Sequence, residues 1–121
     1  MVACKAEFVV VGTFKDARKI IVEIGSDPKS IDIMAPTAVH RCICLSDVAV
    51  QDAIIIKQDM LSVGGEVAIP KDAFYLEKEP VKILVMGTVH QLYLLVEKLS
   101  RHYPRIQRIS QDIDRLLQDI S

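Results

Sequence analysis

Two hydrophobic periodicities divide the 121-residue chain into short stretches typical of strands and longer stretches typical of helices. Short aliphatic runs predict four strands, at residues 6–12, 40–45, 66–70 and 81–87. Apolar residues that recur every three or four positions predict four helices, at residues 13–25, 46–65, 88–102 and 105–120. The order β-α-β-α-β-β-α-α predicts an α/β fold, a single domain over residues 1–121 whose helices cover a mixed four-stranded sheet.

Some stretches need a more specific prediction. Residues 6–12 are β-branched and apolar almost throughout, so we expect a buried strand there. Residues 31–40 are expected to be extended, because Pro36 biases Ala35 away from helical backbone. Residues 71–80 are expected to form a turn containing an edge segment. The amphipathic stripe of the last helix can pack on the sheet, on a second copy or on a partner, and the pattern leaves the three alternatives open.

Polar residues mark where the predicted helices begin. Thr13 and Asp16 have the spacing of a capping box, although the usual partner is Glu or Gln. Ser46 or Asp47 can cap the second helix, and Thr88 with Gln91 forms a second capping box. Gly25 follows the first helix at the position of a C-cap glycine.

Composition narrows the class of protein. Half of the residues are hydrophobic and only 5% are aromatic, so the core must be aliphatic. A net charge of -1 argues against attraction of the whole surface to nucleic acid or to an anionic membrane. We expect no membrane span, because no apolar run reaches about 18 residues. Three cysteines and a start unlike a signal peptide predict a reducing, cytoplasmic location.

Glycines at two junctions raise the question of phosphate binding. Gly64 and Gly65 lie between a helix and a strand, whereas a phosphate loop runs from strand to helix, so a helix end and chain reversal are favoured. The stretch MGT at residues 86–88 has the strand-to-helix order, which makes Gly87, Thr88 and Gln91 the candidate ligand-binding residues for an anion. A capped turn without a ligand explains the same residues.

His40, Cys42 and Cys44 alternate along one predicted strand and therefore share a face. A metal would need a further ligand from Cys4 or His90, and the C-x2-C pairs usual in zinc sites are missing from the sequence. Packing of the cysteines as small hydrophobic residues is favoured. We therefore predict no metal site and no cofactor.

One local cluster is basic. It consists of Lys98, Arg101, Arg105 and Arg108, and it is a candidate interaction face for RNA backbone or a phosphorylated ligand. Acidic residues follow immediately at Asp112 and Asp114, so a solvated face is favoured and nucleic-acid binding is not. Glu66 and Asp72 could be paired carboxylates, but surface positions are favoured, and we predict no catalytic residue.

Three stretches carry a resemblance to a known family: IMAPTAVHR at residues 33–41, KQDMLSVGGEVAI at residues 57–69, and MGTVHQL at residues 86–92. With these stretches, the chain from about residue 8 to about residue 118 resembles the N-terminal extension that precedes the catalytic barrel in some bacterial and archaeal dihydropteroate synthases. That barrel needs a pterin-binding Asp-rich loop and a pyrophosphate-binding loop, and the 121 residues contain neither motif. The resemblance implies an accessory domain of the folate or pterin pathway, free-standing or part of a longer synthase.

Three hypotheses follow for function. The first is a non-catalytic accessory or regulatory domain that acts through protein–protein contact, with a synthase-like protein or a second copy as partner. The second is a module that binds a small anionic metabolite, such as a pterin or nucleotide phosphate, at Gly87 and Thr88. The third is an RNA-binding module that uses the face from Lys98 to Arg108. A homodimer would form through the terminal helix or an open sheet edge.

Overall fold

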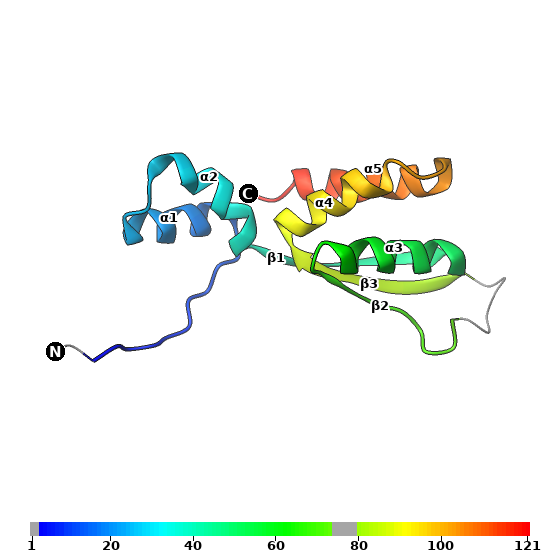
Figure 1. Cartoon of the computed structure of the whole chain (residues 1–121), viewed down its shortest axis with the longest axis horizontal. Helices are drawn as coiled ribbons and strands as arrows, with labels where there is room; N and C mark the ends of the chain where they lie inside the picture. Colours follow the sequence, from blue (N-terminus) through cyan, green and yellow to red (C-terminus); the bar gives the residue numbers. More distant parts are fainter. Residues whose placement is uncertain (1–2, 74–79) are drawn as a thin grey trace.

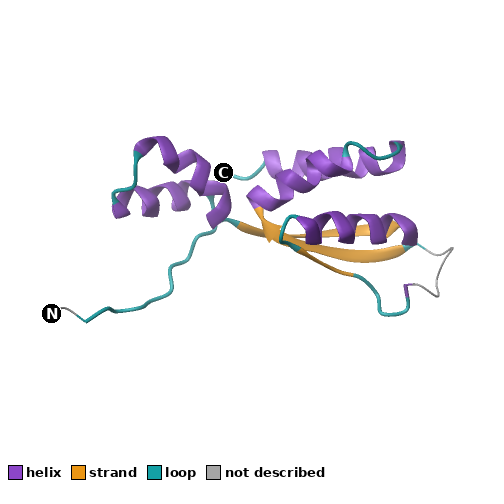
Figure 2. Cartoon of the chain, in the orientation of Figure 1, coloured by secondary structure: helices purple, strands orange, loops and turns teal. Residues whose placement is uncertain are grey.

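A computed structural model describes residues 3–73 and 80–121 of the chain. Its fold is α/β, as the sequence pattern predicts. The described residues form, in order, α1 (Phe14–Ile24), α2 (Pro28–Ala38), β1 (His40–Val48), α3 (Val50–Ser62), β2 (Glu66–Ala68), β3 (Val81–Thr88), α4 (Val89–Leu99) and α5 (Pro104–Gln118). Helices α3, α4 and α5 lie on one side of the sheet, and α1 and α2 form a hairpin at one end of it (Figure 1; Figure 2).

The sheet of the described residues has three antiparallel strands in the order β1-β3-β2. Strand β3 is central, and its side chains alternate between buried and more exposed positions as a strand with one covered face requires. The strands predicted at residues 40–45, 66–70 and 81–87 are therefore confirmed, with changes at their ends. The predicted edge segment within residues 71–80 falls largely on residues 74–79, which lie outside the described residues.

The prediction of a buried strand at residues 6–12 is wrong. We call residues 3–12 the N-terminal arm. The arm is extended, but it belongs to no strand of the described sheet, and Phe8 and Val10 are 105% and 89% exposed. The described sheet accordingly has three strands, all antiparallel, where a mixed sheet of four was expected. The apolar, β-branched sequence sets the extended backbone, but a strand is buried only where a second strand and a core meet it.

Residues 31–38 are also unlike the prediction, because they lie in helix α2 instead of an extended segment. Pro36 falls in the last turn, where its effect on the helix is limited to few hydrogen bonds. The start of α2 is well specified, since Pro28 occupies the first turn and the carboxylate of Asp27 accepts the Lys29 amide at 3.0 Å. Ala35 is 1% exposed, so burial of the helix outweighs the local bias of the X-Pro pair.

The predicted caps are present in three places. Thr13 accepts the Asp16 amide at 3.1 Å, and Gly25 ends α1 with a φ of 86°. Thr88 caps α4 in a full capping box with Gln91. The predicted cap at Ser46 or Asp47 is wrong, because β1 continues to Val48 through an irregular register and Asp47 adopts a φ of 56°.

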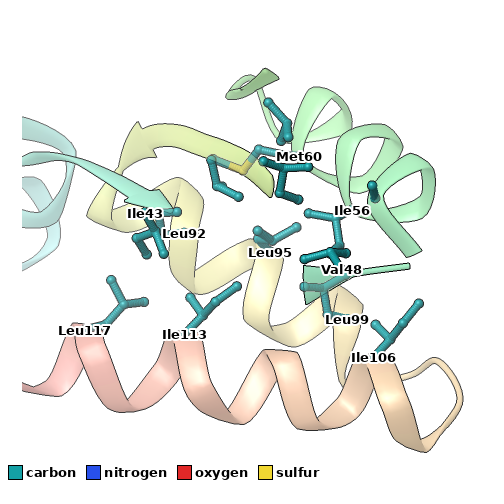
Figure 3. Packing of buried hydrophobic residues seen from close by; sticks show 14 of the residues in the cluster. Ile43, Val48, Ile56, Met60, Leu92, Leu95, Leu99, Ile106, Ile113 and Leu117 are labelled. Carbon is teal, nitrogen blue, oxygen red and sulfur yellow. The ribbon is translucent and has the colours of Figure 1, made fainter. Parts of the chain in front are cut away.

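The core is aliphatic, as the composition predicts, and it lies between the helices and the covered face of the sheet (Figure 3). Helix α5 contributes Ile106, Ile113 and Leu117, each no more than 1% exposed, so it packs on its own chain. Contact of this helix with a second copy or a partner stays a prediction, and Leu116 is 53% exposed. Among the described residues, no helix is long and apolar enough to cross a membrane.

Candidate functional site

The two glycine junctions meet in space. The pairing of β1 and β2 with β3 places His40 opposite Thr88 and Glu66 opposite Met86. An open hollow of about 560 Å³ results, which we call the glycine hollow. It is lined by His40, Gly64, Gly65, Glu66, Met86, Gly87 and Gln91. The sequence does not show that the two junctions meet, because the strand pairing that joins them is not a local property of the chain.

Packing around Met60 explains two of these glycines. A Cβ atom at Gly65 would lie 2.2 Å from Met60 Cε, and one at Gly87 would lie 2.4 Å from the same atom. Met60 is fully buried, so a side chain at either position would displace it. The amides of Gly64 and Gly65 donate to the carbonyls of Leu61 and Met60, which confirms that the glycine pair ends α3.

The proposed anion site at the start of α4 has its first amides already engaged. The Thr88 amide donates to Gln91 Oε1 at 2.9 Å, and the Gln91 amide donates to Thr88 Oγ1 at 3.1 Å. The Val89 amide donates to the Val39 carbonyl at 2.8 Å. An anion at Gly87, Thr88 and Gln91 would therefore have to compete with bonds inside the protein. Binding by these residues stays a prediction.

The candidate metal ligands lie on the outer face of the sheet. His40, Cys42 and Cys44 are all exposed and share a face, as their alternation predicts, whereas the buried Ile43 points to the helices. The expectation that the cysteines pack as small hydrophobic residues is wrong, because no described helix covers that face. Across the described residues, no group of three His, Cys, Asp or Glu side chains could hold a metal ion.

The basic cluster does not form one free face. Arg101 pairs with Glu97 at 2.7 Å, and Arg105 donates from Nε and Nη2 to the carboxylate of Asp52 at 2.5 and 2.9 Å. Arg108 lies with Asp112 around a small cavity of about 190 Å³. Two of the four predicted cations are therefore committed to carboxylates of the same chain. Lys98 is in the last turn of α4.

Asp52 is the functional group that sequence analysis missed. It is only 1% exposed, and it accepts hydrogen bonds from Arg105 and from the hydroxyl of Tyr103. Burial opposes its ionisation, but the bonds from Arg105 and Tyr103 outweigh burial, and the Asp52 pKa is lowered. The signal in the sequence is the position of Asp52 on its helix. Asp52 lies four residues before the buried Ile56 and therefore on the same face, and a carboxylate on a buried face needs a partner.

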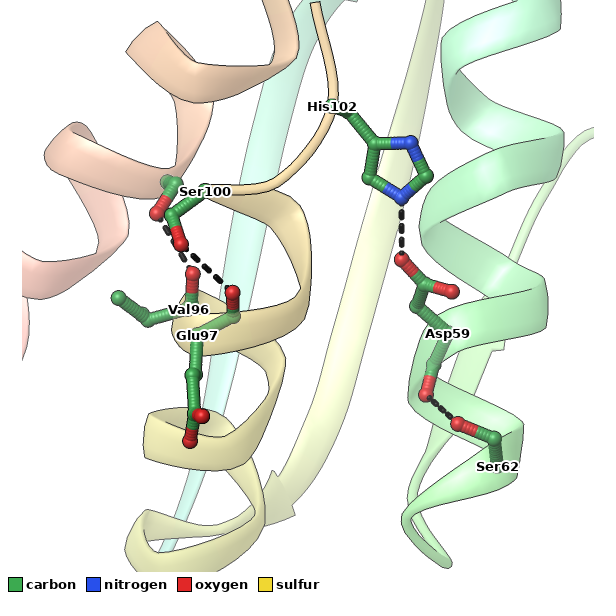
Figure 4. A network of polar contacts seen from close by, with 7 residues as sticks. Asp59, Ser62, Val96, Glu97, Ser100 and His102 are labelled. Atoms are coloured by element: carbon green, nitrogen blue, oxygen red, sulfur yellow. Dashed lines mark hydrogen bonds and ion pairs between the residues drawn. The ribbon is translucent and has the colours of Figure 1, made fainter.

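Two further polar contacts fix the region between α4 and α5. The imidazole of His102 meets the carboxylate of Asp59 at 2.9 Å, which ties the turn to α3 (Figure 4). The buried hydroxyl of Ser110 donates to the Val96 carbonyl at 2.8 Å and joins α5 to α4. Together with the Asp52 cluster, these contacts make the basic stretch a structural junction.

The N-terminal arm and its surroundings form the second candidate site. Phe8 and Val10 are more exposed than Val9, at 57%, and Val11 packs partly against the core, so one side of the arm faces outward. The base of the arm is held where the Arg41 guanidinium donates to the Gly12 carbonyl. Nearby lies a groove of about 200 Å³ between β1 and the end of α5. This β1–α5 groove is lined by Arg41, Cys42, Ile43, Leu116, Leu117 and Ile120.

Comparisons of the chain with protein-family models, with curated proteins and with solved structures find no match. The interpretation of the sites therefore depends on their geometry and on the resemblance noted in the sequence.

Proposed function

We propose that the chain is a non-catalytic accessory domain that acts through protein–protein contact, related to the N-terminal extension of dihydropteroate synthases and located in the cytoplasm. The observation that carries this proposal is the N-terminal arm, whose apolar side chains Phe8 and Val10 are 105% and 89% exposed. Covering a phenyl or isopropyl group with a partner would gain about 1.5–3 kcal/mol for each side chain, and neighbouring exposed apolar side chains mark sites of interaction.

The test of this proposal uses the purified chain and a dihydropteroate synthase barrel. Titration calorimetry should detect binding of the chain to the barrel, and Phe8→Asp should weaken that binding, while the chain alone should produce no pteroate from pterin pyrophosphate and p-aminobenzoate. Lys98→Gln, in the last turn of α4 and outside the arm, is the control variant and should leave the binding unchanged. Turnover by the chain alone would contradict a non-catalytic role.

The glycine hollow supports a second candidate function, the binding of a small anionic metabolite such as a pterin phosphate or nucleotide. The observation in its favour is that Gly64, Gly65 and Gly87 bring backbone from two distant segments close to His40. A ligand that binds only the native state raises its melting temperature. Thermal-shift measurements with pterins, nucleotides and inorganic phosphate at millimolar concentration would detect this, and no shift in any of them would remove the candidate.

A further inference from the structure

The outward side of the N-terminal arm has the alternating pattern of a β-strand, although the arm pairs with no strand of the described sheet. Alternate residues of a strand point to opposite sides, so Ala6, Phe8 and Val10 form one apolar side and Lys5 and Glu7 belong to the other. The exposed fractions follow the same alternation, since Phe8 and Val10 are more exposed than Val9. The arm therefore presents both unpaired backbone and an uncovered apolar stripe.

The β1–α5 groove combines an unpaired strand edge with an apolar pocket, which together match the backbone and the apolar side chains of the arm. Strand β1 is an edge strand, paired with β3 on one side in the described sheet, so its other side can accept backbone hydrogen bonds. Beside this edge, the groove is lined by Ile43, Leu116 and Leu117, and its volume is about 200 Å³. A cavity of about 150 Å³ accommodates benzene, so the groove has room for one phenyl ring. Leu116, at 53% exposure, forms its open wall.

We propose that the arm of one copy inserts Phe8 into the β1–α5 groove of a second copy and pairs its backbone with the edge of β1. This inference rests on the proposed function, because it takes the exposed arm as the protein-binding segment, and it names a second copy in place of a synthase barrel as the protein that covers Phe8. It corresponds to strand addition, in which main-chain bonds supply affinity and a side-chain pocket supplies specificity. The arm becomes the fourth strand of the partner's sheet.

A second copy is the occupant because of where the arm begins. The arm leaves the domain next to its own groove, since Arg41 lines the groove and also binds the Gly12 carbonyl. From there it runs away from its own sheet (Figure 1). When two copies meet at this end about a two-fold axis, each arm faces the groove of the other, and the exchange closes as a dimer. Residues 3–11 extend up to about 30 Å, which is enough to follow β1.

The test measures the mass of the full chain by sedimentation equilibrium from about 1 µM to 1 mM, the range in which a modest interface associates. The wild-type chain is expected to form dimers. Phe8→Asp should raise the dimer dissociation constant at least about 100-fold, because each dimer loses two buried rings worth about tenfold each. Leu116→Asp should do the same from the groove side. Val9→Asp, on the other side of the arm, is the matched control and should change it much less.

A mixture of the two variants provides the decisive measurement. The Phe8→Asp chain keeps an intact groove and the Leu116→Asp chain keeps an intact arm, so a heterodimer retains one complete contact while each homodimer retains none. Mixing should therefore restore association. Absence of restoration, or a dimer insensitive to Phe8→Asp, would overturn the arm exchange. A monomer in which Phe8 is protected from solvent would assign the groove to the chain's own arm and overturn it as well. A monomer that binds a synthase barrel through an exposed Phe8 would overturn the arm exchange and leave the proposed function intact.

Discussion

Removal of Arg105 should destabilise the protein more than neutralisation of its partner Asp52. The two groups share one ion pair, but their surroundings differ, since Asp52 is 1% exposed at its side chain and Arg105 is 52% exposed. Arg105→Met leaves a carboxylate buried without its cation. Asp52→Asn leaves a guanidinium that water already reaches. The amide oxygen in place of Oδ1 can still accept from Tyr103 and from Arg105 Nη2, and the bond from Arg105 Nε is the one that is lost.

The burial of Asp52 and the hydrogen bonds that remain in each variant determine how much stability each substitution should remove. Breaking a buried pair from the side that leaves a buried charge costs about 3–5 kcal/mol. Because Arg105 is 52% exposed, water can reach its place in the Arg105→Met variant, and the Tyr103 hydroxyl still donates to Asp52, so we expect a loss below that range, about 2–3 kcal/mol at pH 7. For Asp52→Asn we expect about 1–2 kcal/mol, the difference between hydrogen bonds to a charged group and to a neutral one.

The pH dependence separates the two variants further. In the wild-type chain the folded pKa of Asp52 is lowered, so its ionised form adds stability that is present above the unfolded pKa near 3.8 and is lost as pH falls through the folded pKa. In Arg105→Met, burial without the cation should raise the folded pKa above the unfolded one. Protonation then relieves the penalty, and the gap between wild type and variant should narrow as pH falls from 7 toward 4.

Urea unfolding followed by circular dichroism at pH 7 and pH 4 measures these differences, with an unchanged m-value as the check that the same transition is compared. Arg115→Met, which removes an exposed arginine from the same helix, is the matched control and should cost less than about 0.5 kcal/mol. Equal losses for Arg105→Met and Asp52→Asn, or a gap that does not change with pH, would refute the reasoning.

Three further substitutions test the packing and the caps by the same urea method. Gly65→Ala should cost about 1–3 kcal/mol because its Cβ would overlap Met60, and the cost should nearly vanish in a Met60→Ala background; an unchanged cost there would contradict the packing argument. Thr88→Ala should cost about 1 kcal/mol through loss of the α4 cap, whereas Thr88→Ser should be nearly neutral. Ser110→Ala should cost no more than about 1 kcal/mol, since the Val96 carbonyl keeps a backbone donor; a much larger loss would show that the hydroxyl has another role.

Local features of the fold were predictable from the sequence. The α/β class, the strand at residues 81–87 and the caps at Thr13, Gly25 and Thr88 depend on residues within one turn or one strand of each other. Helix α5 was predicted from its apolar stripe, but its position against α4 required the structure. These successes involve short-range patterns that the chain expresses wherever it packs.

The failures all depend on contacts between distant parts of the chain. The arm has the sequence of a strand, but its burial depends on a partner that neighbouring residues do not specify. Helix α2 forms in spite of Pro36, because burial of Ala35 outweighs a local bias. The bond between Asp52 and Arg105 joins positions 53 residues apart, so a cluster that looked free in sequence is a structural junction. Of the candidate ligand residues, Gly87 and Gln91 line a hollow whose other wall comes from the glycine pair after α3, a neighbour that the sequence does not show, and ligand binding there stays a prediction.

The central claim is that the N-terminal arm is the protein-binding segment of this domain. Hydrogen–deuterium exchange of the amides at residues 6–11, measured in the full chain at low and at high protein concentration, tests it most directly. The account predicts exchange as fast as in an unstructured peptide at low concentration, and protection that increases with concentration in the wild-type chain but not in Phe8→Asp. Fast exchange at every concentration, or protection already complete in the monomer, would contradict it.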